Sequence, residues 1–467
     1  MQIAVTQVAQ QALLLFRNIL VARLLPPEQF GIALTLVTVV SALDAISELG
    51  IELYLIRSPD TGDHSLQDTL HSALIARGML SATALFLMAH PVSRLFGAAE
   101  AAWAYQMLAV VPLIRSFYHL DVRRFERDMR FWPGLVNSSV AMLAGTIAAI
   151  VLALQLRDYS AMLYATILQA AVLAVGSHLL ATRKYRLGRD KAQSRRLLDF
   201  GLPLLANGIL LFLAMQGDRV IVGSLLGMHA LAVYGAIAIL TGGVTLLVNK
   251  ISGSLYLPIL SGSQPGEAVY ERRYEFCGAI SALLAILTMI VFGTVGAPLA
   301  QLAYGKAYDL PPLLAVFLGL QSGFRILRSW PQIGFLATAS TKSLLIANVT
   351  SAIGLAGAAI CLLLGLSLSA AAASLALGEC LAALVSFLRQ RQLAPGTYHV
   401  SFRFFAAVCA MAALVAAINL VGLPAAGFVT HLGMALMLAT LGVAAVLWCS
   451  RAARQALARL CKPSARN

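Results

Sequence analysis

Charge is scarce along this chain, and that scarcity excludes most soluble proteins. Only 12% of the 467 residues are charged and 60% are hydrophobic, whereas soluble domains carry about 25% charged and about 45–50% apolar residues. The apolar excess runs over the whole length, so a soluble enzyme with a single anchor is also excluded. Cysteine is rare too: there are six, and no two form a Cys-x-x-Cys pair. We therefore predict neither a metal site nor a disulfide framework.

The sequence also lacks the common motifs of catalysis and of ATP use. It has no Walker A motif, which would cradle a nucleotide phosphate, and no Gly-x-Ser-x-Gly or His-Glu-x-x-His motif. The first residues have no basic region before an apolar run, so no secretory signal is expected. We expect no cofactor and no metal. Structural roles are expected for the scattered histidines, which are His71, His90, His119, His178 and His431.

The most prominent feature of the sequence is a series of long apolar runs. A membrane-spanning helix needs about 20 mostly apolar residues, and the loops between such runs are short. The pattern predicts an all-α polytopic membrane protein with about fourteen transmembrane helices. Their expected ranges are 4–25, 29–56, 66–90, 99–120, 132–154, 159–181, 198–226, 229–259, 272–296, 311–337, 343–366, 367–388, 402–423 and 428–450.

The distribution of lysine and arginine predicts the orientation. With the N-terminus in the cytoplasm, the inner loops and the C-terminal tail hold 23 of these residues and the outer loops hold 3. Such a bias towards the cytoplasmic side is the positive-inside rule. It accounts for most of the formal charge of +14 without a nucleic-acid partner. Both termini are therefore expected in the cytoplasm.

A weak internal repeat predicts two related halves. Leu24-Leu25 aligns with Leu225-Leu226, Tyr54 with Tyr256, and the segment 91–97 with 298–305, at offsets of 201 to 207. Both copies start on the same side, so the repeat is parallel, as in transporters whose substrate site lies between the halves near the midplane. The expected organisation is a six-helix lobe at 1–182, a basic cytoplasmic linker at 183–197, a second six-helix lobe at 198–388, an extra helix pair at 401–450 and a basic tail at 451–467.

Several charged residues fall inside the apolar runs. On insertion scales each costs about 2.5–3.5 kcal/mol at the bilayer centre, so such side chains usually face a watery cavity or a partner. We interpret the basic residues as a cationic cavity for an anionic headgroup, because the guanidinium fork suits phosphate. The alternative is structural ion pairing, for example of Arg17 with Glu48 or of Arg77 with Asp44. The predicted cavity residues are Arg17, Arg77, Arg325, Arg328 and Lys250.

Acidic residues in the same runs have a second interpretation. Asp44, Glu48 and Glu52 are spaced by four and form one stripe on the expected helix 29–56. They either neutralise nearby arginines, which we favour, or bind a coupling proton or sodium ion. Asp218 and Arg219 mark the end of the expected helix 198–226, and a gating or coupling role is the alternative. Arg115 and Arg219 lie near the faces of the bilayer, where we favour snorkelling or pairs that lock the lobes together.

Three segments resemble the signatures of a known family. They are Arg17-Asn-Ile-Leu-Val-Ala-Arg-Leu-Leu-Pro-Pro-Glu-Gln-Phe-Gly31, Ser47-Glu-Leu-Gly-Ile-Glu-Leu-Tyr-Leu-Ile-Arg57, and Phe200-Gly-Leu-Pro-Leu-Leu205 followed by Gly217-Asp-Arg-Val-Ile-Val-Gly-Ser-Leu-Leu-Gly227. They resemble the polysaccharide transporter family, the Wzx-type oligosaccharide flippases of the MOP superfamily. The stretch before residue 4 is shorter than the helical lead-in common in that family, which suggests a native start further upstream.

The resemblance implies a function and partners. Members move undecaprenyl-diphosphate-linked oligosaccharide repeat units from the cytoplasmic to the periplasmic leaflet of the bacterial inner membrane, for exopolysaccharide, O-antigen or capsule synthesis. Two lobes would alternate in access, and Arg17 matches the position of a family-type cavity cation. Implied partners are the lipid-linked oligosaccharide, membrane lipids, and a polysaccharide polymerase with its co-polymerase. Three alternatives stay open: a cation-coupled multidrug antiporter of the same superfamily, a lipid II flippase, and, least favoured because the loops are short, a membrane glycan polymerase or ligase.

Overall fold

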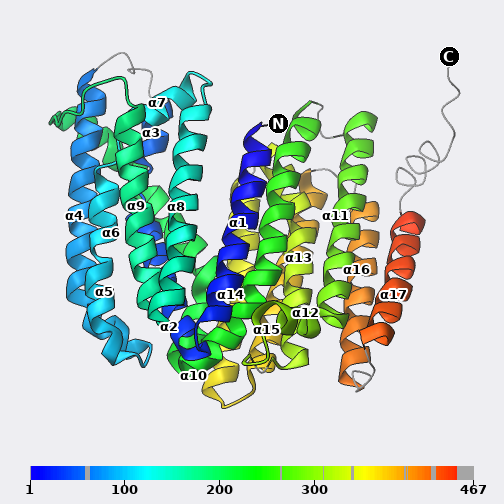
Figure 1. Ribbon diagram of the computed structural model, residues 1–467. Helices are drawn as coiled ribbons and strands as arrows, with labels where there is room; N and C mark the ends of the chain where they lie inside the picture. The colour runs from blue at the N-terminus through cyan, green and yellow to red at the C-terminus, as the bar shows by residue number, and fades with distance from the viewer. Residues whose placement is uncertain are drawn as a thin grey trace, which may run out of the picture. The chain divides into compact units, whose positions relative to one another are not determined.

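The computed structural model describes residues 2–57, 64–262, 266–308, 310–337, 341–393, 396, 398–421 and 428–449. In this part of the chain every regular element is a helix, which confirms the all-α class (Figure 1). Ten of the described helices are long and apolar enough to cross a membrane, so the chain is a multi-pass membrane protein. The count of fourteen spans is not confirmed, partly because two expected spans are broken into shorter helices. The predicted tail at 451–467 lies outside the described residues.

The chain divides into two compact units, Met1–Gly235 and Ala236–Asn467. The lobe boundaries expected at 182 and 198 stay a prediction. The first unit contains the start of α10 (Lys191–Ser261) and, before it, α1 (Gln2–Leu24), α2 (Pro27–Ser47), α3 (Ile51–Arg57), α4 (His64–Leu95), the 3₁₀ helix η1 (Ala99–Ala101), α5 (Ala102–Leu108), α6 (Val110–Ser116), α7 (Asp121–Arg127), α8 (Trp132–Leu156) and α9 (Ser160–Leu180).

The second unit contains the rest of α10 and seven further helices. They are α11 (Ala268–Thr294), α12 (Gly296–Tyr304), α13 (Pro312–Ala337), α14 (Thr341–Leu363), α15 (Leu368–Leu393), α16 (Tyr398–Leu420) and α17 (Phe428–Cys449). Within this unit α11 packs on α13, and α14 packs on α15. Inside the 71 residues of α10, Gly227 has φ 82° and ψ −176°, which no helical residue adopts. The turn predicted between 226 and 229 therefore lies inside α10.

Two of the expected spans are interrupted, each for a local reason. The span 29–56 stops at Ser47 and resumes at Ile51, because Gly50 takes a φ of 63° that is open to glycine. The Glu48 side chain accepts a hydrogen bond from the Gly50 N–H at 2.8 Å. The span 99–120 becomes η1, α5 and α6. Pro112 has no N–H to bond back to Leu108, the last residue of α5.

Each unit has its own apolar core. In the first unit Ile32, Leu36, Leu108 and Leu163 are buried together around Tyr105, whose hydroxyl lies 2.5 Å from that of Thr35. In the second unit the fully buried Trp330 is the centre of a larger cluster with aromatic residues from α11, α15 and α16. These cores hold the helices on which the polar residues below are placed.

Gly31 shows that one family-like motif is structural. A Cβ atom at this position would lie 2.1 Å from the carbonyl oxygen of Met228, far inside contact distance. Only glycine allows α2 to approach this backbone so closely. The glycine that ends the first signature therefore serves packing within the first unit.

Candidate functional site

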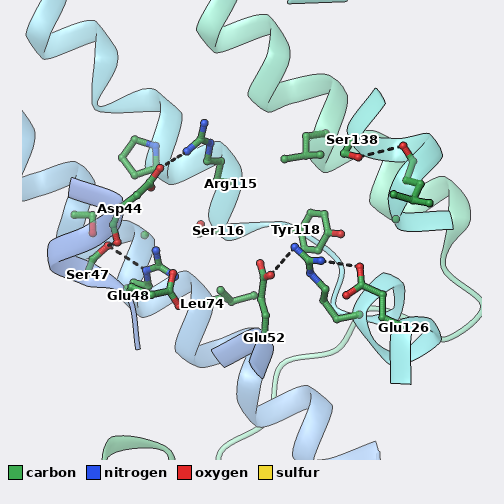
Figure 2. Close-up of a pocket in the computed structure, with 18 of the residues that line it drawn as sticks. Asp44, Ser47, Glu48, Glu52, Leu74, Arg115, Ser116, Tyr118, Glu126 and Ser138 are labelled. Carbon is green, nitrogen blue, oxygen red and sulfur yellow. Dashed lines mark hydrogen bonds and ion pairs between the residues drawn. The ribbon is translucent and has the colours of Figure 1, made fainter. Parts of the chain in front are cut away.

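A cavity of about 680 Å³ opens among α1, α2, α3, α4, α6, α7, α8 and α9 of the first unit (Figure 2). Its lining mixes polar and apolar surface and contains both charge signs. The acidic lining residues are Asp44, Glu48, Glu52 and Glu126; the basic ones are Arg77, Arg115 and Arg123. Lys250 and the buried arginines of α13 belong to the second unit. Of the predicted cavity cations, the structure therefore places Arg77 on this lining.

The break between α2 and α3 distributes the acidic stripe over the cavity. Asp44 lies in the last turn of α2, Glu48 follows the end of that helix, and Glu52 lies in the first turn of α3. An unbroken helix would stack carboxyls four residues apart along one line. The turn at Gly50 lets them reach three different helices instead.

Each carboxylate of the stripe has an arginine partner. Arg115 on α6 reaches Asp44 at 2.5 Å, and Arg77 on α4 reaches Glu48 at 3.5 Å. Arg77 also donates from Nε to the Ser47 hydroxyl at 3.1 Å. This is the neutralising role that we favoured for the stripe. The partners differ from the two examples predicted, because Arg77 pairs with Glu48 and not with Asp44.

The third carboxylate belongs to a three-residue group. Arg123 on α7 contacts Glu52 at 2.6 Å and Glu126 at 2.7 Å. Figure 2 shows the two carboxyl groups directed at one guanidinium from opposite sides. Both residues fall between the expected spans 99–120 and 132–154, so the apolar pattern does not mark them. Their i, i+3 spacing was the one signal that could have marked them.

The exposed fractions show which charges a ligand would meet. The side chains of Asp44, Glu48 and Glu52 are 42–47% exposed, whereas those of the paired arginines are 18–34% exposed. The lining therefore presents carboxylate oxygens more than guanidinium groups. An anionic group would meet like charge here, whereas hydroxyl groups could donate to the carboxylates.

Uncharged polar groups complete the lining. Gln10 on α1 donates from Nε2 to the hydroxyls of Ser138 and Ser139 on α8, at 3.0 and 3.1 Å. The neighbouring Gln7 also faces the cavity, and the aromatic rings of Tyr118 and Phe131 line it. Amides, hydroxyls and rings of this kind match the hydroxyl groups and the apolar faces of sugars.

Arg17 lies seven residues beyond Gln10 on α1, two turns along the same face. Its side chain is buried, and one guanidinium nitrogen donates to Gln169 on α9 at 3.3 Å. Its Nε atom has no hydrogen-bond partner. Among the described residues no carboxylate forms an ion pair with Arg17, so the pair with Glu48, our example of the structural alternative, does not form. Within the described part of the chain, the buried charge of Arg17 thus has no counter-charge.

The remaining predicted residues lie elsewhere. In the second unit Glu379 on α15 pairs with Arg325 at 2.8 Å and with Arg328 at 3.2 Å. All three side chains are largely buried, whereas Lys250 is exposed. A separate group is formed by Asp218, whose carboxylate accepts hydrogen bonds from the Tyr234 hydroxyl at 2.5 Å and from the N–H of Arg219 at 2.9 Å.

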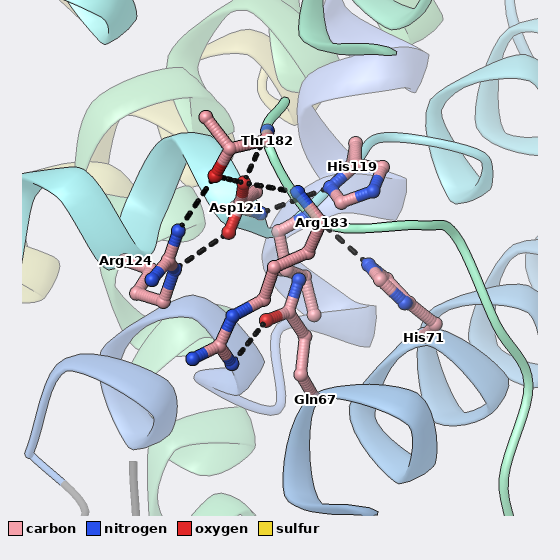
Figure 3. A network of polar contacts seen from close by, with 8 residues as sticks. Gln67, His71, His119, Asp121, Arg124, Thr182 and Arg183 are labelled. Atoms are coloured by element: carbon pink, nitrogen blue, oxygen red, sulfur yellow. Dashed lines mark hydrogen bonds and ion pairs between the residues drawn. The ribbon is translucent and has the colours of Figure 1, made fainter. Parts of the chain in front are cut away.

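A second polar network lies next to the cavity, and the sequence did not reveal it (Figure 3). Asp121, at the start of α7, is fully buried. Its carboxylate accepts hydrogen bonds from Arg124 Nε at 2.6 Å, from the N–H and hydroxyl of Thr182 at 2.7 and 2.9 Å, and from the N–H of Arg183 at 3.1 Å. Burial would raise the pKa of Asp121, but these four donors outweigh it and lower the pKa to about 2.

Three of the scattered histidines belong to this network. The ring of Tyr185 lies 4.3 Å from His71, 5.0 Å from His178 and 5.5 Å from His119, between ring centroids. His71 accepts the N–H of Leu120 at Nε2 and so donates from Nδ1 to the Arg186 carbonyl. The expected structural role thus describes these side chains, and no metal-binding group occurs among the described residues.

Comparisons with known proteins agree with this architecture. The family model described as polysaccharide biosynthesis protein matches residues 20–310. The succinoglycan biosynthesis transport protein ExoT of Rhizobium meliloti (strain 1021) is 26% identical over 325 residues, which are 68% of this chain and 60% of that protein. The chain thus spans about 60% of the length of this curated relative.

Two solved structures share the fold. The lipid II flippase MurJ in an inward closed conformation has a TM-score of 0.69 at 14% identity, covering 97% of this chain and 99% of MurJ. An inward-facing multidrug resistance transporter of the MATE family has a TM-score of 0.62 at 17% identity, covering 83% of this chain and 97% of that one. At these identities the likeness concerns the fold alone.

Proposed function

Because the chain belongs to the polysaccharide biosynthesis protein family, we propose that it is a flippase for a lipid-linked oligosaccharide. The cargo would be a repeat unit on undecaprenyl diphosphate, moved from the cytoplasmic to the periplasmic leaflet of the bacterial inner membrane by alternating access. The polyprenyl tail stays in the lipid while the sugars and the diphosphate cross through protein. We expect no catalytic step.

The observation that carries this proposal is the charge-paired cavity of the first unit. Arg77, Arg115 and Arg123 are all bound to carboxylates, and the carboxylates are the more exposed partners. Such a lining suits an uncharged, polyhydroxylated group. The cavity adjoins α7 and the loop that follows it, which the positive-inside rule assigns to the cytoplasm. With the predicted orientation, the cavity would receive sugars from that side.

The diphosphate needs a different group, and Arg17 has the required chemistry. It is buried and lacks a counter-charge among the described residues. A phosphate oxygen would supply the missing partner for its guanidinium fork. Gln7, Gln10 and Arg17 follow one face of α1, so a headgroup could extend from sugar contacts to this charge. Arg77 and Arg325 would act on the cargo only after they leave their carboxylate partners.

The membrane potential can supply part of the driving force. The potential, negative inside, favours outward movement of two negative charges by about 4–5 kcal/mol per 100 mV. Coupling to a proton or sodium ion through Asp44, Glu48 or Asp218 is the competing mechanism. A polymerase and co-polymerase would consume the exported units.

The two same-fold alternatives predict different cavities. A cation-coupled drug antiporter needs carboxylates that are free to bind a cationic drug, whereas Asp44, Glu48 and Glu52 are all paired. A lipid II flippase would use the same chemistry on a different cargo. Only the identity of the transported lipid separates it from the function proposed here.

The test is deletion of the gene, followed by assay of surface polysaccharide and of lipid-linked repeat units in each leaflet. The proposal expects loss of polymer with units accumulating on the cytoplasmic side. Complementation with Arg17→Ala should fail although the protein inserts, whereas Arg130→Ala, an exposed arginine after α7, should restore polymer. Unchanged polymer with altered drug sensitivity would point to the antiporter, and units accumulating in the periplasmic leaflet to a polymerase.

A further inference from the structure

The short helix α7 has two functional faces. Asp121 and Arg124 are three residues apart and share one face, and Arg123 and Glu126 share the opposite face. The second pair lines the cavity, where Arg123 is bound to Glu52 on α3. The first pair binds the chain segment that leaves α9. One seven-residue helix therefore belongs to both networks.

The segment bound by Asp121 is the irregular connection from α9 to α10, and we call residues 181–188 the strap. The Asp121 carboxylate holds the first turn of the strap through two backbone N–H groups. Further along, the Gly188 N–H donates to the carbonyl of Asp68 at 3.0 Å and to the hydroxyl of Ser72 at 3.1 Å, both on α4. The strap is thus fixed at both ends to the first unit.

The middle of the strap is fixed as well. Arg183 donates to Gln67 at 3.3 Å, and the carbonyl of Arg186 accepts a hydrogen bond from His71. The ring of Tyr185 lies among three histidine rings. A segment without regular structure rarely has so many fixed contacts, because loops usually lie free on the surface. Two charged residues of α7 hold its first turn: the Asp121 carboxylate accepts the N–H groups of Thr182 and Arg183, and Arg124 donates to the Thr182 hydroxyl at 2.9 Å.

We propose that Asp121 is a positioning residue that couples the strap to the cavity through α7. When Arg123 leaves Glu52, as a ligand bound between them would require, α7 loses its anchor on α3. The Asp121 carboxylate moves with the helix, and the backbone N–H groups of Thr182 and Arg183 lose their acceptor. The strap leads directly into α10 at Lys191, so an occupied cavity loosens the start of the next long helix.

Any effect of this coupling on transport rests on the proposed function. The coupling between the Glu52–Arg123 pair and the strap does not, because it can be measured without a substrate. The test therefore measures amide hydrogen exchange of the strap in the full-length protein in detergent, without any substrate. Asp121→Asn serves as the reference, because it removes the charged acceptor, and we expect exchange at Thr182 and Arg183 to rise about tenfold. If that variant does not fold, exchange at these two amides in the wild-type protein serves as the baseline for the cavity variants.

The decisive variant is Glu52→Gln, because Glu52 binds the cavity face of α7 and forms no hydrogen bond or ion pair with the described residues of the strap. This variant should raise amide hydrogen exchange at Thr182 and Arg183 above the wild-type rate, towards the rate in Asp121→Asn. Its matched control is Asp44→Asn, which breaks another ion pair of the same cavity, with Arg115 on α6, and should leave strap exchange unchanged. An unaltered strap in Glu52→Gln, or an equal rise in both variants, would overturn the coupling. The two proposals can fail independently. The coupling fails if strap exchange does not respond to Glu52→Gln, whereas the flippase function fails if deletion of the gene leaves polymer unchanged.

Discussion

Replacing Arg17 with methionine is expected to stabilise the protein while it abolishes transport. The side chain is 7% exposed and has one hydrogen bond, at 3.3 Å, for its whole guanidinium group. An arginine in a spanning helix costs up to about 2.5–3.5 kcal/mol on insertion scales, the value for the bilayer centre, and a single hydrogen bond to a charged group returns about 1.5 kcal/mol. Methionine keeps the unbranched stem without the charge. We therefore expect unfolding to become about 1–2 kcal/mol less favourable.

The matched control is the same substitution at Arg328. Its exposure is nearly identical at 5%, but its guanidinium is paired with Glu379 and bonded to the carbonyl of Ala347. Breaking a buried ion pair from one side costs about 3–5 kcal/mol. Because Arg325 would still hold Glu379, we expect a smaller loss of about 2–3 kcal/mol for Arg328→Met.

The assay pairs two measurements on each variant: the thermal unfolding midpoint of purified protein in one detergent, and polymer production in a deletion strain. Arg17→Met should raise the midpoint and fail to restore polymer, as expected where a binding site is kept at the expense of stability. A midpoint lowered as much as in Arg328→Met would refute the reasoning, since Arg17 would then contribute to folding and not to binding.

Three further predictions follow from single contacts. Gly31→Ala should prevent normal folding, because its Cβ would lie 2.1 Å from a backbone oxygen, whereas Gly242→Ala, with nothing within 4 Å, should leave the yield of folded protein unchanged. Asp44→Arg and Arg115→Asp should each reduce complementation, and the double exchange should recover most of it, because the ion pair is restored. The difference in unfolding midpoint between wild type and Asp121→Asn should be constant from pH 7 to about pH 5. It should shrink at lower pH, because a lowered pKa of about 2 stabilises the fold only while the carboxylate stays ionised.

Most of the helical layout was predictable because a spanning helix depends on the residues of its own segment. An apolar run of sufficient length forms a helix wherever its neighbours lie, and turn residues such as Gly227 mark where it ends. The all-α class and the polytopic character followed from this alone. The interruptions were less visible: Pro112 and Gly50 were present in the sequence, but the apolar pattern continues across both positions.

The acidic stripe was predictable in part. Spacing by four places Asp44, Glu48 and Glu52 on one face and indicates that arginines will neutralise them. The choice of partner depends on which helices lie opposite, and nothing along a single helix specifies that. The structure brings α4, α6 and α7 to this face and so pairs each carboxylate with its own arginine.

Most helical segments, the family and the charged residues inside the apolar runs could be read from the chain alone, because these properties depend on segments of a few dozen residues. Which of those charges are satisfied depends on how the helices pack against one another. Arg77 and Arg17 looked alike as isolated cations, but one is neutralised by Glu48 and the other has no counter-charge among the described residues. The strap and its anchor Asp121 also arose only on folding, because their partners are separated by about sixty residues of chain. Whether a buried polar group has a partner depends on the side chains around it, and helix packing places those side chains.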